Sequence, residues 1–161
     1  MNFPYYDPEK VSTLYALEPN PGMVRLAKRK AHQTLNIEFL DLPGERIPLE
    51  NESIDTVVST FTLCTIPGIV DAIQGIARVL RAGGELLFFE LGLSPDLKVQ
   101  RWQKQLEPIF HWLFQGLHLT RDIPSLLTQG GLQIKQVEMG YVVDSPKALT
   151  YCWWGIAIKN K

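Results

Sequence analysis

The clearest hydrophobic pattern of the chain lies between residues 53 and 91. Residues 54–61 form a short β-branched run, which is typical of a strand buried on both faces. Apolar residues then recur at helical spacing and predict one buried helix face: Ile73, Ile76, Ala77, Leu80. Gly83–Gly84 is expected to end this helix, and residues 85–91 form a second apolar run. A strand, a helix and a strand in this order predict a right-handed parallel crossover.

The part before this unit continues the alternation of strands and helices. Residues 12–18 and 36–42 are two further apolar runs that predict strands. Between them, Asn20 is a natural N-cap, and Pro21 suits the first position of a helix. Residues 43–52 are rich in turn formers and are expected to form a loop. The chain is therefore predicted to be an α/β protein.

The last third of the chain departs from this alternation. An apolar stripe at helical spacing runs along residues 97–117: Val99, Trp102, Leu106, Ile109, Phe110, Leu113, Leu117. Core packing explains such a stripe, and a lid over an apolar substrate is the alternative, so residues 97–131 are expected to form a helical, lid-like insertion. Residues 123–129 resemble a short helix. The runs at 132–141 and 151–159 are joined by a segment too short for a helical crossover, so they predict an antiparallel hairpin.

Composition limits the classes of partner. A chain of 161 residues with 45% hydrophobic residues fits a single domain, 1–161. The net charge of −1 does not indicate a basic surface for binding nucleic acid, and no basic run in the sequence suits anionic lipid. No apolar run reaches the ~18 residues of an integral membrane segment. Cys64 and Cys152 lack metal-ligand spacing, so no metal site is expected, and they read as buried thiols in a reducing cytoplasm.

Glu18 is a candidate for ligand binding because it ends the strand predicted at 12–18. In doubly wound α/β folds, ligands bind outside the carboxyl ends of parallel strands. A carboxylate in that place can accept hydrogen bonds from ribose hydroxyls. It is equally well explained as a solvated acid that favours the helix N-terminus after it. Its position alone leaves both interpretations open.

Three segments together resemble the class I methyltransferases that use S-adenosylmethionine. Residues 17–23 resemble the acidic strand end and the following helix of that family. Residues 44–49 and 53–58 resemble its adenine-side loop and fourth strand, and residues 78–86 resemble the turn before its fifth strand. The resemblance implies a Rossmann-like, mostly parallel sheet with a C-terminal antiparallel hairpin, and S-adenosylmethionine as cofactor.

The resemblance also assigns cofactor-binding residues: Glu18, Asn20, Met23, Gly44, Glu45, Thr60, Phe61, Thr62. By this resemblance Glu18 holds the ribose and Glu45 the adenine amino group. Asn20 and Met23 contact the adenine edge, and residues 60–62 line the methionine part and the path of the methyl acceptor. No catalytic residue is assigned.

Further segments, 62–65, 102–114 and 119–121, resemble the methyltransferase-like alkyl thiol methyltransferases and their bacterial relatives. This implies a small lipophilic acceptor, either a thiol or a lipid- or quinone-like molecule. A thiol reacts as its thiolate, whereas an amine or carbon acceptor needs a base. His111 and His118 are the histidines near the presumed lid, and His118 is the candidate for that role, with a surface or packing role as the commoner explanation. Arg121 and Asp122 are expected to form an exposed pair.

One feature of the family is missing from the sequence. Class I methyltransferases begin with a strand and a glycine-rich loop under the methionine part of the cofactor, and this chain has no such loop. We therefore expect an N-terminally incomplete domain that lacks the central strand between residues 14–18 and 54–61. A neighbouring chain, as a homodimer or by strand exchange, is the alternative way to fill this place.

Two other functions compete with methyl transfer. The chain can be an inactive methyltransferase remnant that serves only as an interaction module. A nicotinamide-dependent oxidoreductase is disfavoured because the sequence contains no G-x-G-x-x-G motif. A cytoplasmic location is expected, with peripheral membrane association as the alternative.

Overall fold

The computed structural model describes residues 2–18, 20–30, 35–40, 47–114, 116–142 and 146–160. The chain divides into two compact units, Met1–Ile47 and Pro48–Lys161.

The first unit contains a small parallel sheet with one helix. Its elements are η1 (Phe3–Tyr5), β1 (Leu14–Leu17), α1 (Pro21–Lys30) and β2 (Ile37–Leu40). β1 and β2 pair in parallel, with Leu14 opposite Ile37. Both strands lie within the runs predicted at 12–18 and 36–42, and α1 begins at Pro21 as predicted. The β-α-β order of this part of the sequence is confirmed.

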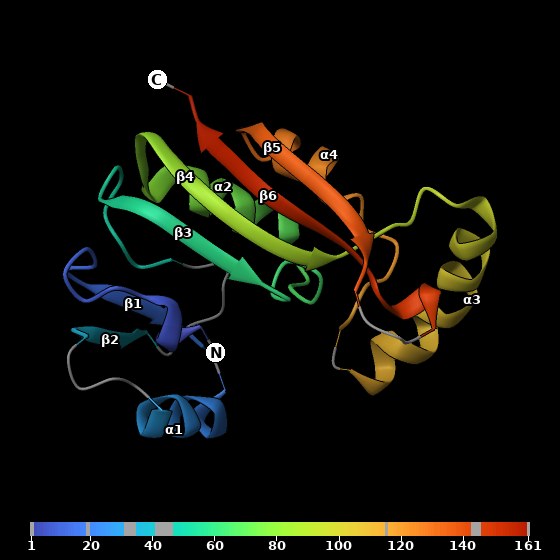
Figure 1. Ribbon diagram of the computed structural model, residues 1–161, viewed down its shortest axis with the longest axis horizontal. Helices are drawn as coiled ribbons and strands as arrows, with labels where there is room; N and C mark the ends of the chain where they lie inside the picture. Colours follow the sequence, from blue (N-terminus) through green and yellow to red (C-terminus); the bar gives the residue numbers. More distant parts are fainter. Residues whose placement is uncertain are drawn as a thin grey trace. The chain divides into compact units, whose positions relative to one another are not determined.

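The second unit contains a four-stranded mixed sheet. Its elements are β3 (Ile54–Thr60), α2 (Ile69–Val79), β4 (Leu80–Leu91), α3 (Leu97–Leu113), α4 (Ile123–Gln129), β5 (Leu132–Tyr141), η2 (Lys147–Leu149) and β6 (Tyr151–Lys159). The strand order is β3-β4-β6-β5 (Figure 1). β3 and β4 are parallel, whereas β6 runs antiparallel to both β4 and β5. The parallel crossover and the terminal hairpin predicted from the sequence are both confirmed.

The junction of α2 and β4 differs from the prediction. The helix ends at Val79, and Leu80, which was expected to complete its apolar stripe, already has extended backbone. Gly83–Gly84 lies inside β4 and does not cap the helix. The ladder with β3 shifts register between Ile54 and Thr56, and Gly83 has a φ of +77° at this irregularity. The glycines therefore serve a bulged strand, where a left-handed residue can be accommodated.

The helices α2 and α4 cover one face of this sheet (Figure 1). Leu86 and Phe88 of β4 are buried on that side, whereas the alternate residues Val58 and Leu87 are 39% and 36% exposed. The prediction that residues 54–61 are buried on both faces is therefore wrong. β3 is an edge strand of its sheet, and its outer face, together with the outer faces of β4 and β6, borders a shallow hollow of about 380 Å³.

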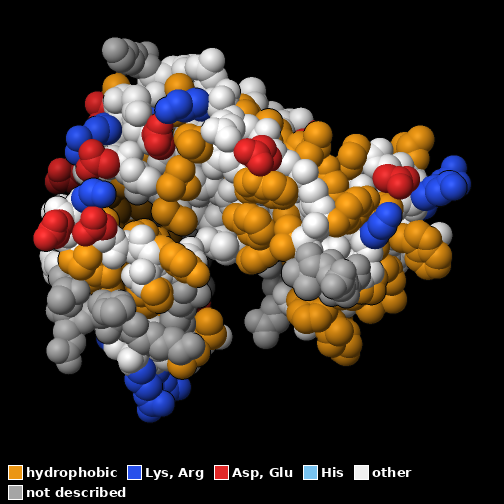
Figure 2. All heavy atoms as spheres, in the orientation of Figure 1, with side chains coloured by type: hydrophobic (Ala, Val, Ile, Leu, Met, Phe, Trp, Pro, Cys, Tyr) orange, Lys and Arg blue, Asp and Glu red, His pale blue; other side chains and the backbone are white. Residues whose placement is uncertain are grey.

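α3 turns much of its predicted apolar stripe toward solvent. Val99 and Gln103 are its buried residues, whereas Trp102, Ile109 and Leu113 are exposed. Hydrophobic side chains gather at the surface over this helix (Figure 2). Core packing therefore explains only part of the stripe.

Candidate functional site

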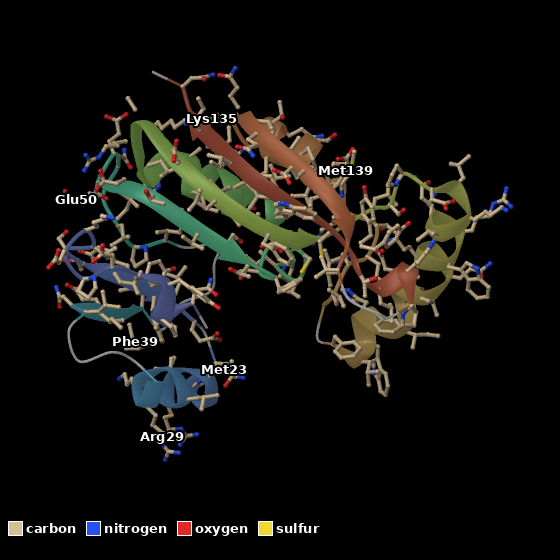
Figure 3. The ribbon with its side chains drawn as sticks, in the orientation of Figure 1. Met23, Arg29, Phe39, Glu50, Lys135 and Met139 are labelled. Atoms are coloured by element: carbon tan, nitrogen blue, oxygen red, sulfur yellow. The ribbon has the colours of Figure 1, made fainter. Side chains whose placement is uncertain are left out.

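The first group of predicted site residues lies where β1 ends and α1 begins. The backbone amide of Asn20 donates a hydrogen bond to Glu18 Oε1, at 3.0 Å. Asn20 Oδ1 accepts from the amides of Gly22 at 2.8 Å and Met23 at 3.3 Å, which confirms Asn20 as the N-cap. Met23 extends from the first turn of α1 and is 41% exposed (Figure 3). Glu18, Asn20 and Met23 are thus brought together by one local turn.

Glu18 keeps part of its hydrogen-bonding capacity. Within the described residues, its Oε1 accepts the Asn20 amide, and its Oε2 accepts no hydrogen bond. An ionised carboxylate has about four acceptor sites, so this group can accept further donors such as the vicinal hydroxyls of a ribose. The adenine-side residues Gly44 and Glu45 lie outside the described residues.

The second group of predicted site residues lies in the other unit, at the carboxyl end of β3. Thr60 is the last residue of β3, and Phe61 follows with a φ of +52°, in the left-handed region. The Phe61 amide donates to Phe89 O at 2.9 Å, and its ring packs edge-on against the Phe89 ring with 5.1 Å between centroids. Bulky residues hold such a backbone conformation only where their surroundings enforce it, and functional sites are where such strain is found.

Glu90 of β4 is the residue that enforces this turn. Its side chain is fully buried. Glu90 Oε1 accepts from Ser59 Oγ at 2.6 Å and from the Thr62 amide at 3.1 Å, and Oε2 accepts from the Cys64 amide at 3.1 Å. These three donors satisfy a carboxylate that would otherwise be too costly to bury. The buried side chain of Glu90 therefore holds residues 59–64 in place.

Arg121 belongs to the same cluster, which corrects the expectation of an exposed Arg121–Asp122 pair. The Arg121 guanidinium donates to the Leu63 carbonyl. Burial lowers the pKa of Arg121, and nearby negative groups, Glu90 among them, oppose this shift. Asp122 instead caps α4, accepting from the Ser125 amide at 3.3 Å and from Ser125 Oγ at 2.7 Å. Arg121 and Asp122 are adjacent in the sequence, but Arg121 binds the segment after β3, whereas Asp122 caps α4.

The two cysteines are buried free thiols, as expected. Burial raises the pKa of Cys64 far above its ordinary value, and the charge and hydrogen bond of Glu90 add to this effect. Burial and, to a smaller extent, the charge of Glu90 raise the pKa of Cys152 to about 11. Both side chains therefore stay protonated near neutral pH, which excludes them as thiolate nucleophiles.

We accordingly expect the native protein to resist thiol reagents. Neither Cys64 nor Cys152 should react with Ellman's reagent near neutral pH at the rate of glutathione, because both are buried and protonated. Both should react after unfolding in guanidinium chloride, which provides the control. Rapid labelling of either thiol in the folded protein would contradict this assignment.

A hollow of about 350 Å³ lies between α3 and the segment that follows it. Its lining includes Glu107, His111 and His118. His118 Nδ1 lies 3.1 Å from Glu107 Oε1, and the Leu119 amide donates to Glu107 Oε2 at 3.1 Å. The ring centroids of His111 and His118 are 4.7 Å apart. The His118 amide donates to Cys64 O at 2.8 Å, so the hollow borders the turn that Glu90 holds.

The environment of Glu107 favours its ionised form. Burial raises the pKa of Glu107, but hydrogen bonds from Thr120 and His118, together with the charge of His118, outweigh burial and leave the pKa below its ordinary value. A carboxylate that orients a histidine in this way is the usual arrangement for a proton acceptor.

Sequence reasoning missed the roles of Glu90 and Glu107. Glu90, the carboxylate that interrupts the apolar run of residues 86–91, is a usable signal, because a buried strand keeps an acid only where donors surround it. The sequence around Glu107 contains no comparable signal, since its hydrogen-bond partners, His118 and Leu119, lie beyond the end of α3. Within the described residues, no group of three or more His, Cys, Asp or Glu side chains suits a metal ion.

Comparison with known proteins supports one family. A family model described as a methyltransferase domain matches residues 2–88, just over half of the chain. Thiol S-methyltransferase TMT1B of Rattus norvegicus is 31% identical over 126 residues, which cover 75% of this chain and 51% of the relative. The phthiotriol/phenolphthiotriol dimycocerosates methyltransferase of Mycobacterium leprae is 32% identical over 87 residues, which cover 54% of this chain and 31% of the relative.

The fold has a counterpart among solved structures. A SAM-dependent methyltransferase of Methanosarcina mazei superposes with a TM-score of 0.72 at 18% identity, over 95% of this chain and 84% of that chain. This likeness confirms the predicted Rossmann-like class. The chain spans about half the length, or less, of the two curated relatives named above.

Proposed function

Because this chain belongs to the methyltransferase domain family, we propose that it takes part in methyl transfer from S-adenosylmethionine to a small lipophilic acceptor, with a thiol as the first candidate. S-adenosylmethionine is the cofactor that this family and fold imply. The observation that carries the proposal is the turn after β1, where Glu18 Oε2 accepts no hydrogen bond from the described residues and lies beside the Asn20 cap.

The residues of this turn fit the nucleoside part of the cofactor. Glu18 would accept hydrogen bonds from the two ribose hydroxyls, and its charge strengthens such bonds. Its carboxylate is held in place by the Asn20 amide, so little side-chain entropy remains to be lost on binding. Met23, exposed at the first turn of α1, offers an apolar contact for the adenine ring.

When bound, S-adenosylmethionine supplies a methyl group on a sulfonium sulfur, and transfer of that group to a nucleophile leaves a neutral thioether. The protein therefore has no leaving group to protonate. Its task is to align the acceptor, and alignment alone accounts for a large part of such a barrier. We assign this task to the turn of residues 60–62, which Glu90 keeps in a single conformation.

We assign the acceptor side of the reaction to the hollow lined by Glu107, His111 and His118, where the His118 amide donates to Cys64 O. A thiol acceptor loses its proton before or during methyl transfer, and His118 would take that proton at a ring nitrogen. Glu107 would orient the His118 ring and stabilise its positive charge. TMT1B is by name a thiol S-methyltransferase, which favours a thiol over other lipophilic acceptors.

Calorimetry with S-adenosylhomocysteine tests the proposal. We expect saturable binding to the wild-type chain and none of NADH. Glu18→Gln should weaken the binding about tenfold to a hundredfold, because charge-assisted hydrogen bonds contribute about 1.5–3 kcal/mol. Glu38→Gln, an exposed acid on β2, is the matched control and should leave the affinity unchanged.

The result that would overturn the proposal is equally specific. Binding of NADH without S-adenosylhomocysteine would indicate a different enzyme class. Binding of neither molecule would favour a non-catalytic interaction module.

A further inference from the structure

The helix α3 buries one polar and one apolar side chain, Gln103 and Val99, and leaves most of its large apolar side chains exposed. Its inner face holds Gln103, which is 1% exposed, whereas Trp112 and Trp102 on other faces are 81% and 61% exposed. Gln103 is fixed from both ends, because Nε2 donates to Gly92 O and Oε1 accepts from the Ser94 amide, each at 3.0 Å. A helix on a protein in water normally buries its apolar stripe. The orientation of α3 is therefore set by a polar anchor, and its apolar side chains are presented outward.

Most of the outward apolar residues lie in the second half of the helix, and Leu97 and Trp102 lie in the first half. Following Pro108, the exposed large side chains are Ile109, Trp112, Leu113 and, at the C-cap, Phe114. Figure 2 shows hydrophobic side chains massed over this helix. Scattered single apolar residues need no explanation on a surface, whereas a contiguous group of this kind marks an interaction site.

The first half of the same helix is basic. Lys98, Arg101 and Lys104 are all exposed, and none of them forms an ion pair with any residue that the structure describes. The one acidic side chain of α3, Glu107, faces the hollow and is occupied by His118 and the Leu119 amide. The exposed surface of α3 is thus cationic, although the whole chain has a net charge of −1 and these residues, spaced three apart, form no basic run in the sequence.

The presence of both apolar and basic side chains on the exposed surface of α3 indicates whether a lipid or a protein binds there. The cores of protein–protein interfaces are depleted of charged residues, lysine among them. Helices that lie in the plane of a membrane combine exposed Trp, Phe and Leu with Lys and Arg, and tryptophan prefers the boundary between headgroups and acyl chains. Anionic headgroups complement the charge of Lys98, Arg101 and Lys104. No helix within the described residues is long and apolar enough to cross a membrane, so contact by α3 would be made along its side.

We propose that the outer surface of α3 binds the surface of an anionic lipid bilayer. The aromatic half, Ile109 to Phe114, enters the boundary between headgroups and acyl chains. The basic half, Lys98 to Lys104, contacts the headgroups. None of the residues in contact with lipid is assigned to the cofactor, whereas Lys104 and His111 also line the hollow assigned to the acceptor.

The test is binding of the purified full chain to sedimenting vesicles of phosphatidylcholine, with and without phosphatidylserine. We expect strong binding only in the presence of phosphatidylserine, reduced by high salt. Tryptophan emission should shift to the blue on binding, because Trp102 and Trp112 leave water.

Two sets of substitutions separate the apolar and the basic contributions. Trp112→Ser should weaken binding about tenfold, because it removes the most exposed large apolar group of α3. The triple variant Lys98→Gln, Arg101→Gln, Lys104→Gln should weaken binding to phosphatidylserine vesicles about a hundredfold. Tyr5→Ser is the matched control, since Tyr5 is 86% exposed and lies outside α3. All of these side chains are exposed, so circular dichroism should show unchanged folding.

Several outcomes would overturn the proposal. These are absence of vesicle binding, equal binding to neutral and anionic vesicles, and binding that Trp112→Ser leaves intact. Self-association in analytical ultracentrifugation that is abolished by Trp112→Ser, without vesicle binding, would instead identify α3 as an interface between copies of the chain. Loss of S-adenosylhomocysteine binding would not affect this inference, because the vesicle assay contains no cofactor.

Discussion

Replacing Glu90 by alanine is expected to lower the free energy of unfolding by about 3–5 kcal/mol. The substitution leaves the buried Ser59 hydroxyl, the buried Cys64 amide and the part-buried Thr62 amide without an acceptor. It also removes the negative charge that lies near the half-buried guanidinium of Arg121. Each unsatisfied buried donor contributes a penalty of about 1–3 kcal/mol.

Glu90→Gln should have a smaller effect, about 1–3 kcal/mol, because its amide oxygen can keep two of the three hydrogen bonds. Its amide nitrogen would then face the donor of Cys64. The matched control is Glu85→Gln in the same strand, where the acid forms a surface pair with Lys135 at 2.7 Å and its loss should cost less than about 1 kcal/mol.

Urea denaturation followed by tryptophan fluorescence measures these effects. All four tryptophans lie in the unit Pro48–Lys161, so the signal reports the unfolding of the sheet that contains Glu90. A midpoint for Glu90→Ala that equals that of Glu85→Gln would show that Glu90 does not hold the turn after β3.

Replacing Gly155 by alanine is expected to be the second most damaging change, at about 3 kcal/mol or more. Gly155 lies in β6 opposite Val137, beside the irregularity in the ladder with β5. A methyl group on Gly155 would overlap the carbonyl oxygen of Gln136 and would also approach the Val137 backbone to 3.0 Å. Because these atoms belong to the backbone of the paired strand, they cannot rotate away as a side chain would.

Gly131→Ala is the matched control for this substitution. Gly131 follows α4 with a φ of +94°, and an added methyl group there would meet no atom within 4 Å. Its cost is therefore the backbone strain alone, about 1–2 kcal/mol. Urea denaturation of both variants should rank Gly155→Ala well below Gly131→Ala in stability. Equal stabilities would indicate that β5 moves away from β6 without penalty.

Much of the secondary structure could be predicted because its signals are local. The Asn20–Pro21 pair fixes the start of α1, since Asn20 Oδ1 accepts from amides two and three residues further along the chain. The strands 132–141 and 151–159 appear with the predicted bounds because apolar runs flank a short connection. Within the candidate site, the same local turn brings Glu18, Asn20 and Met23 together as the sequence suggested.

The predictions that were wrong concern segments where tertiary packing overrides the local sequence pattern. Gly83–Gly84 looked like a helix C-cap, but pairing of Leu80 with Ile54 begins the strand before the glycines are reached. The stripe on α3 looked like a buried face, but the hydrogen bonds of Gln103 to residues 92 and 94 set the rotation of the helix. The sequence pattern could not reveal these partners because they depend on contacts between elements.

The sequence by itself determined the α/β class, the order of the strands and helices along the chain, and the turn that positions Glu18, since all three depend on short-range propensity and periodicity. Only the tertiary structure decided what Glu90 and Glu107 do, because their hydrogen-bond partners lie 26 to 31 and 11 to 12 residues away. It also decided that both the basic and the aromatic side chains of α3 are exposed. Burial and hydrogen bonding between distant segments are properties of the packed chain, so no reading of neighbouring residues could supply them.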